Sequence, residues 1–559
     1  MTGIDLGRLG RRAADGVRRL TSRAADGPVL GFAVLAVLGL SASTAVVLAG
    51  GRVGPVLGST PLTSWFGILS HTGVVSNHRG DISVTSALPG LTFLAAIVAL
   101  VVTWLLAQRS LRARDWSPAR IWGLAAIWAT PLMLGPPLLS SDVYAYAAQG
   151  ILAARGLDPS TTGIAALGDP ATNPAVAAVD PTWRQVHSPY GPVATVLEHG
   201  AYHLGGTPLG AVVLLRVLAV ASVAAIGLTA AAIAGPEHRR TALTLTILNP
   251  LLLLHVVAAA HLEGVLCACA LAAFLALQRG HPHLAVALGC TAGMVKAPAI
   301  AVAVVVVVVV VCREAEPGRR ALTGAGLLTA AAATMVALSL LVPDGWGWLG
   351  ALTTPGQGFT PDAPSTFAAI LATPLFVWTG VTTFATVSGV CQIIAMGVAA
   401  VIGFWLLKTA DRRTPAATAG QALLTASVLG PVIYPWYFLW GVVLLAPAAR
   451  GRTRDWAVKL SALGAVMAVQ GLATLTIGIV ATLIIVVMTA WVMHTNRWTP
   501  QFAVAADSVA PGEPAGLAGA ATPGPVDARY VRDVHAVDLT LQGQAAPRLR
   551  AAEPVYETR

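Results

Sequence analysis

The chain has 559 residues, of which 56% are hydrophobic and only 11% are charged, and its mean hydropathy is +0.73. A soluble protein carries about twice this fraction of charged residues, so the composition excludes a soluble globular protein. The formal net charge of +10 does not indicate nucleic-acid binding, because the basic residues lie between apolar runs, where they report orientation in a membrane.

Apolar windows of about 20 residues, the length that crosses a hydrocarbon core, recur from residue 29 to residue 494. They predict an all-α, polytopic membrane domain over residues 29–498, with about 12 to 14 transmembrane helices, some of them broken. The Arg-rich residues 1–28 are predicted to form a cytoplasmic N-terminus. Residues 499–559, rich in Ala, Pro and Gly, are predicted to form a disordered cytoplasmic tail.

Basic segments orient the first predicted spans. Residues 29–49, 85–106 and 121–139 are predicted to cross the membrane in turn. The following residues 140–207 are too polar to be embedded as a whole, so we expect them to form the main external loop. A span over 208–234 then returns the chain to the cytoplasm.

The next two spans, 241–258 and 263–278, are predicted to form a hairpin with the outer turn "AAHLEG". Residues 284–312 are predicted to form two helices that break at "MVKAPA", with Pro298 as the breaker. One long helix would instead place the basic segment that follows on the outside.

The same reasoning predicts a break in residues 416–449 at "GPVIYPWYFLW", because "RGRTR" follows. Before it we expect spans over 321–341 and 383–407, with a second external loop at 342–365 between them. Two more spans between about 457 and 494 would leave the C-terminus inside. Every irregular break therefore falls on the outer side.

The stretch "SSDVYAYAAQG" places a carboxylate where a long apolar run ends. If it begins a helix, Asp142, Tyr146 and Gln149 are spaced i, i+4 and i+7 and share one face. A carboxylate backed by a phenol and an amide can orient a sugar hydroxyl and take its proton. The alternative is a helix start, in which Ser140 or Ser141 is the cap and the acid only complements the helix dipole.

Further along the same loop, "VDPTWRQVHSPYGPV" holds Trp183, Arg184, His187 and Tyr190 among turn-forming prolines. These side chains could serve only to fold the loop on itself. Alternatively, the aromatic rings offer flat faces for sugar rings, and arginine can grip a phosphate with two hydrogen bonds.

Three ionisable residues are predicted at membrane depth: His261, Glu263 and Lys296. Such residues are costly there and are functional candidates by default. One alternative is that Glu263 and Lys296 neutralise one another across the bundle. The other makes Lys296 a phosphate ligand near the lipid headgroups. Because His261 and Glu263 are spaced i, i+2, we expect them to point to different faces and not to form a metal site.

Aromatic residues cluster in two further outer segments. Trp346 and Trp348 lie in the second external loop, and Trp436 and Tyr437 lie in "YPWYFLW". Interfacial aromatics usually mark headgroup depth. The alternatives are stacking of an acceptor sugar in the first segment and a wall of a lipid-chain groove in the second.

Five motifs in order resemble one known family. They are "SSDVYAYAAQG", "WRQVHSPYGP", "ILNPLLLLHVVAAAHLEG", "MVKAPA" and "GPVIYPWYFLW". Together, over about residues 85–495, they resemble the actinobacterial polyprenyl-phosphate-mannose-dependent α-(1→6)-mannosyltransferases. The resemblance implies a GT-C glycosyltransferase that builds the mannan backbone of lipomannan and lipoarabinomannan in the plasma membrane. The family's intramembrane turn resembles "AHND", whereas this chain has "AHLEG", which leaves the role of Glu263 open.

The resemblance also implies an external catalytic acid at the start of the first large loop, a position that Asp142 holds. The expected reaction is an inverting transfer from polyprenyl-phosphate mannose to a mannosylated lipid acceptor, with no metal or other cofactor and with Asp142 as general base. The residues expected to bind donor or acceptor are Tyr144, Tyr146, Gln149, Trp183, Arg184, His187, Tyr190, His261, Glu263, Lys296, Trp436 and Tyr437. For the leaving phosphate, the candidates are Lys296 and Arg184.

Two other functions fit part of the pattern. A transporter or flippase of lipid-linked sugars would also use broken helices and buried ionisable residues. A related lipid-sugar ligase or polymerase would share the carboxylate and use another donor.

Overall fold

A computed structural model of the chain describes residues 30–53, 84–114, 116–352, 354, 360, 363–377, 383–467 and 487–488. Within these residues the chain is helical and has no β-strand, which confirms the all-α prediction. The predictions for the N-terminus before residue 30, for the tail after 498 and for most of the last two spans lie outside the described residues.

In the part of the chain that the structure describes, five helices are long and apolar enough to cross a membrane by length and composition, so the chain is a multi-pass membrane protein. They are α2 (Phe32–Val53), α3 (Val84–Ala113), α9 (Pro208–Leu245), α14 (Pro317–Ser339) and α17 (Phe384–Lys408).

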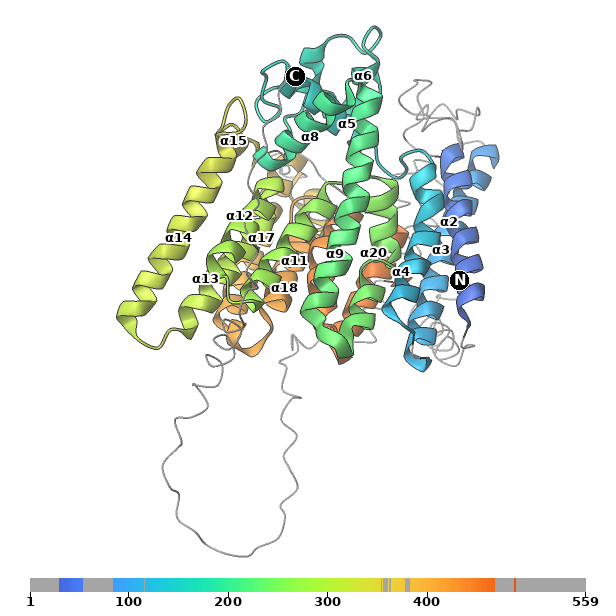
Figure 1. The fold of residues 1–559 in the computed structure, drawn as a ribbon. Helices are drawn as coiled ribbons and strands as arrows, with labels where there is room; N and C mark the ends of the chain where they lie inside the picture. Colours follow the sequence, from blue (N-terminus) through green and yellow to red (C-terminus); the bar gives the residue numbers. More distant parts are fainter. Residues whose placement is uncertain are drawn as a thin grey trace, which may run out of the picture. The chain divides into compact units, whose positions relative to one another are not determined.

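Shorter apolar helices accompany them (Figure 1). Besides the helices of residues 140–207, which are described below, the structure has α4 (Pro118–Leu134), α11 (Glu263–Gln278), α12 (Pro282–Val295), α13 (Ala301–Arg313), α16 (Pro364–Val377), α18 (Pro415–Leu429), α19 (Phe438–Leu445) and α20 (Gly451–Met467). Helix α16 was missed from the sequence, although its residues are apolar. The predicted count of about 12 to 14 spans stays a prediction.

Hydrogen bonds from buried indoles connect the first helices to each other and to the rest of the bundle. Trp128 Nε1 in α4 donates to Leu35 O in α2 at 3.0 Å, and Gly39 gives this indole the room to approach. Trp104 Nε1 in α3 donates to Thr244 O in α9 at 2.9 Å. Small residues and hydrogen bonds between helices stabilise packing in lipid, where no hydrophobic effect drives it.

Both predicted helix breaks are confirmed. Helix α12 ends at Val295, a 3₁₀ turn η4 (Ala297–Ile300) carries Pro298, and α13 follows. Helix α18 ends at Leu429, a 3₁₀ turn η7 (Pro435–Tyr437) follows, and α19 begins at Phe438. Proline lacks the N–H that a continuous helix would need at these positions.

The hairpin before α11 is less regular than its hydropathy predicted. Helix α9 runs on to Leu245 through a kink at Gly235, where φ is 71°. The first arm of the predicted hairpin, residues 241–258, is not one regular helix: it consists of the end of α9, the short α10 (Pro250–Leu252) and a π-helical turn η3 (Leu253–Ala258). π-helical turns are rare in proteins, and those that occur often lie at functional sites.

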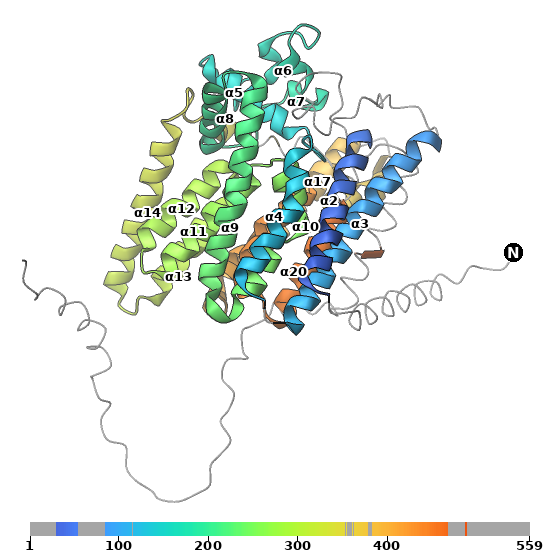
Figure 2. The ribbon, with the colours of Figure 1, turned by 45° about the vertical axis from the view of Figure 1, so that its right-hand side comes forward.

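Residues 140–207 form a group of small helices at one end of the bundle (Figures 1 and 2). We call this end the loop end. The elements of this segment are α5 (Asp142–Ala154), η2 (Ile164–Leu167), α6 (Pro174–Ala177), α7 (Pro181–Arg184) and α8 (Pro192–Gly205). Helix α15 (Trp348–Ala351) also lies at the loop end, whereas the basic α13–α14 turn lies at the opposite end (Figure 1).

Candidate active site

Asp142 occupies the first turn of α5, as its position in the sequence predicted. Its side chain is 19% exposed, so the carboxylate is largely but not wholly enclosed. The backbone N–H of Asp142 donates to Ser140 Oγ at 3.1 Å, whereas the N-cap Ser141 makes no side-chain cap bond. Ser140 therefore fixes the start of the helix and Ser141 does not.

His261, in the turn before α11, lies beside the Asp142 carboxylate. Its Nδ1 lies 3.4 Å from Asp142 Oδ2, 3.5 Å from Tyr146 Oη and 3.9 Å from Glu263 Oε2. The expectation that His261 and Glu263 point to different faces is wrong, because His261 precedes the helix. Ala260, at φ 59°, turns the chain there, so the i, i+2 rule for helices does not apply.

A continuous polar chain leads from Tyr146 to the ion pair. Tyr146 Oη and Tyr190 Oη share a hydrogen bond of 2.7 Å, and Lys296 Nζ donates to Tyr190 Oη at 3.3 Å. Lys296 Nζ also donates to Glu263 Oε1 at 2.6 Å, and both side chains are buried. The alternative in which Glu263 and Lys296 neutralise one another is thus realised in the geometry.

Two contacts decide where Tyr190 lies. Ser188 Oγ donates to Gln149 Oε1 at 3.2 Å, so Gln149 anchors the loop. The N–H of Gly191 donates to Val295 O at 3.0 Å, and a Cβ at residue 191 would lie 2.3 Å from Met294 O. Only a glycine allows the loop to approach the end of α12 this closely, which places Tyr190 beside Lys296.

Aromatic rings of the η7–α19 break complete the cluster. Trp436 stacks on His261 with ring centroids 4.1 Å apart. Lys296 Nζ lies 4.4 Å from the ring centroid of Tyr190, 4.6 Å from that of Tyr437 and 5.5 Å from that of Trp440. Ring faces of this kind stabilise a buried ammonium group.

Burial raises the pKa of the Asp142 carboxyl from 3.8 to about 6. The Ser140 hydrogen bond and the Lys296 charge lower this pKa, and the Glu263 charge raises it, but burial is the largest cause. Asp142 therefore combines a partly open position with a proton affinity near that of a histidine. This suits a general base that works near neutral pH.

Several nitrogen atoms near this cluster are buried and have no hydrogen-bond partner among the described residues. They are both ring nitrogens of His255, Nε2 of His261, and Nε1 of Trp436 and of Trp440. The His255 ring lies 5.9 Å from that of His261 and 5.6 Å from that of Trp436. His255 is not among the site residues predicted from the sequence. Its position as an ionisable residue inside the apolar run "LLLLHVVAAA" could have indicated it.

Four predicted site residues lie elsewhere in the described chain or have other partners. Tyr144 is buried beside the charge of Arg216, with no hydrogen-bond partner for its hydroxyl among the described residues. Arg184 donates through Nε to Val179 O at 2.9 Å and through Nη2 to Ala177 O at 3.1 Å, so it braces the loop. Trp183 packs against the core and His187 is exposed, and their roles stay predictions.

Among the described residues, no group of three His, Cys, Asp or Glu side chains is arranged to hold a metal ion.

Comparisons with known proteins place this cluster in a family. A protein-family model described as "Alpha-(1→6)-mannopyranosyltransferase, N-terminal domain" matches residues 36–313, and a second family model, described as "MptB C-terminal domain", matches residues 365–497. Together the two matches cover most of the chain and all the residues of the cluster. The chain belongs to the alpha-(1→6)-mannopyranosyltransferase family.

Curated relatives agree with the assignment at low identity. A protein named probable alpha-(1→6)-mannopyranosyltransferase from Mycolicibacterium smegmatis is 27% identical over 406 residues, covering 64% of this chain and 71% of its own length. Alpha-(1→6)-mannopyranosyltransferase A of Mycobacterium tuberculosis is 27% identical over 365 residues, covering 63% and 70%. Alpha-(1→6)-mannopyranosyltransferase B of Corynebacterium glutamicum is 29% identical over 347 residues, covering 56% of each chain.

Proposed function

We propose that this protein transfers mannose from polyprenyl-phosphate mannose to an α-(1→6)-linked mannan acceptor on a lipid, with Asp142 as general base. The observation that carries the proposal is the position of Asp142. It is a partly exposed carboxylate with a raised pKa at the loop end, beside the buried His261 and Tyr146. The family match supplies the class of sugar.

The reaction is a single displacement. Asp142 takes the proton of the acceptor hydroxyl, the oxygen attacks the anomeric carbon of mannose, and the bond from that carbon to the phosphate oxygen breaks. The electron pair of this bond leaves with the polyprenyl phosphate, so a β-mannosyl phosphate gives an α-mannoside. One proton moves to Asp142, and no oxidant or reductant is needed.

The leaving phosphate gains negative charge and needs donors. Lys296 is one candidate, although Glu263 offsets part of its charge. Further candidates are the buried nitrogens of His255, His261, Trp436 and Trp440, which have no hydrogen-bond partner among the described residues. Arg184 is a weaker candidate than we expected, because two of its donors are engaged by the loop. Such donors would replace a metal ion in this scheme.

The test is an assay of the purified full chain in lipid nanodiscs with polyprenyl-phosphate mannose and an α-(1→6)-mannobioside. We expect a product longer by one mannose, with an α-(1→6) linkage shown by NMR, and unchanged formation in the presence of EDTA. If vesicles instead show flux of the intact lipid-linked sugar without a new glycosidic bond, the chain is a transporter and the proposal is wrong.

The raised pKa of Asp142 predicts the pH dependence of the reaction. A general base must be ionised, so kcat/KM should fall about tenfold per pH unit below the pKa and level off above it. With a pKa of about 6, the acidic limb should lie below pH 6. Initial rates between pH 4.5 and about 8 measure this; a flat profile down to about pH 5 would contradict the assignment.

A further inference from the structure

A buried arginine lies behind the cluster around Asp142. Arg216, in α9, is only 3% exposed. Its guanidinium donates through Nη1 to Gly135 O at 2.9 Å, and through Nη2 to Leu132 O at 2.5 Å and to Val257 O at 3.4 Å. A charged side chain inside a membrane domain is costly, and hydrogen bonds to backbone carbonyls offset its burial. Arg216 therefore holds carbonyl groups of two other elements together.

Two of these carbonyls belong to the end of α4. In a longer helix Leu132 O would accept from the N–H of residue 136, but residues 136 and 137 are prolines and have no N–H. The C-cap Gly135 is extended, at φ −73° and ψ 168°, so its own carbonyl leaves the helical ladder. Basic side chains can bond the last carbonyls of a helix. Arg216 supplies the donors that this end of α4 lacks.

The third carbonyl belongs to η3, the π-helical turn before His261. Val257 is the fifth of its six residues. The backbones of the same two segments also meet, because Leu138 N, just after α4, donates to Ala258 O at 3.3 Å. The end of α4 and the end of η3 are therefore joined twice, once through Arg216 and once directly.

Each of these segments continues through a left-handed residue to a member of the cluster. Leu139, at φ 72°, lies three residues before Asp142, and Ala260, at φ 59°, lies directly before His261. They are the two non-glycine residues with positive φ in the part of the chain that the structure describes. This conformation is unfavourable for a residue with a side chain and persists where surrounding contacts impose it. The contacts of Arg216 supply such a constraint just before both turns.

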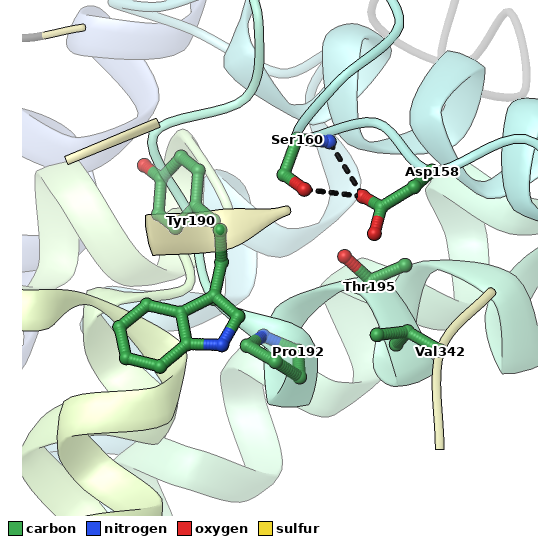
Figure 3. A pocket seen from close by; sticks show the side chains of 8 residues that line it. Asp158, Ser160, Tyr190, Pro192, Thr195 and Val342 are labelled. Atoms are coloured by element: carbon green, nitrogen blue, oxygen red, sulfur yellow. Dashed lines mark hydrogen bonds between the residues drawn. The ribbon is translucent and has the colours of Figure 1, made fainter. Parts of the chain in front are cut away.

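The other half of the cluster is held by different contacts. The loop segment that carries Tyr190 is braced by its own turn, in which Asp158 Oδ1 accepts from Ser160 N at 2.7 Å and from Ser160 Oγ at 2.6 Å (Figure 3). Its close approach to the end of α12, next to Lys296, was described above. Without Arg216 we therefore expect the carboxylate and the imidazole of the cluster to shift, and the ion pair of Lys296 to stay in place.

We infer that Arg216 is a positioning residue for the transfer reaction: it ties the end of α4 to η3 and so keeps the Asp142 carboxylate beside the His261 ring. The inference rests on the proposed function. The distance that Arg216 controls is the 3.4 Å between Asp142 Oδ2 and His261 Nδ1. Arg216 acts through the two turns and not through contact with a substrate. A shift of a catalytic group by about 1 Å can cost about a hundredfold in rate.

The test is Arg216→Lys. A lysine keeps the charge but has one nitrogen in place of a planar fork, so it cannot bond both segments in the same geometry. We expect kcat to fall about tenfold to a hundredfold, while KM for the donor stays within about threefold of the wild-type value.

Arg320→Lys is the matched control. Arg320 is exposed and donates from two nitrogens to one backbone carbonyl, Glu314 O, at 3.0 Å and 2.6 Å. It lies in the α13–α14 turn region at the end of the bundle opposite the loop end (Figure 1). This variant should keep the wild-type kcat and KM values.

The pH profile separates positioning from a general loss of stability. Burial is the largest cause of the raised pKa of Asp142, about 6. If the His261 ring moves away, water reaches the carboxylate and its pKa falls toward the ordinary value. The acidic limb of kcat/KM should then move to lower pH by about half a pH unit or more. The nearby charges of Glu263, Lys296 and Asp180 are not changed by the substitution. A lower stability alone would reduce the melting temperature and leave the limb in place.

Arg216→Gln repeats the comparison without the charge, because its amide nitrogen has two N–H donors, and it should show the same changes. If the folded variants keep either the wild-type kcat or the wild-type acidic limb, Arg216 serves only stability. The same holds if neither variant folds while Arg320→Lys does. In both cases the inference is wrong and the proposed function stands. If the wild type transfers no mannose under the same conditions, the proposed function and the inference are both wrong.

Discussion

Asp142→Asn should abolish mannose transfer, with a loss of at least about a thousandfold in kcat. The amide keeps the shape of the carboxyl but cannot take a proton, and general-base catalysis contributes about 10²–10⁴-fold. The variant should still fold, because the native carboxylate pays for its own burial, as its raised pKa shows. The measurement is the initial rate of product formation, with the melting temperature in detergent as a check on folding.

Asp169→Asn is the matched control, because Asp169 is an exposed acid of the same loop whose Oδ1 accepts from Ala171 N. An asparagine oxygen can make the same bond, so its rate should equal that of the wild type. Turnover of Asp142→Asn within tenfold of the wild-type rate would show that Asp142 is not the base. If Asp142→Asn still binds donor and acceptor, its loss of activity comes from the chemical step and not from weaker substrate binding.

Replacing Lys296 by methionine should destabilise the protein strongly. It leaves the buried Glu263 without its cation at 2.6 Å, and breaking one side of a buried ion pair costs about 3–5 kcal/mol. The double variant Lys296→Met with Glu263→Gln removes both charges and should regain most of the melting temperature.

Transfer distinguishes a structural pair from a functional one. If Lys296 assists the leaving phosphate, the stable double variant should still lose at least about a hundredfold in kcat/KM for the donor, while KM for the acceptor changes little. Glu263→Gln alone should keep more activity than either variant that lacks Lys296. If the double variant has the wild-type kcat/KM for the donor, Lys296 contributes to the stability of the protein and not to catalysis.

The breaks at Pro298 and Pro435 show what local sequence rules can reach. Hydropathy sets the lengths of the apolar runs, and the positions of the basic residues set the expected orientation of each run. Together with the prolines, these local features predicted the two breaks without tertiary information, although Pro131 and Pro374 lie inside α4 and α16 without ending them. The same rules failed for the residues before α11. A π-helical turn, which packs against α4 and α9, and the positive φ of Ala260 replaced a regular helix there.

The face of α5 was predicted from its spacing and is partly realised. Asp142 and Tyr146 both reach His261, as a shared helical face allows. Gln149 lies on the same face but contacts Ser188, so it positions the loop. Spacing shows which side chains share a face; it does not show which partner each of them meets.

The sequence by itself determined that this is a multi-pass helical membrane protein, where several of its helices break, and which acid begins the loop segment. Those properties follow from composition, proline and apolar length, which act over a few turns of helix. The tertiary structure decided that Tyr190, His261 and Lys296 meet beside Asp142, although they come from distant elements. The physical reason is close packing: Gly191 lets one loop touch the end of α12, and no local pattern encodes its partner.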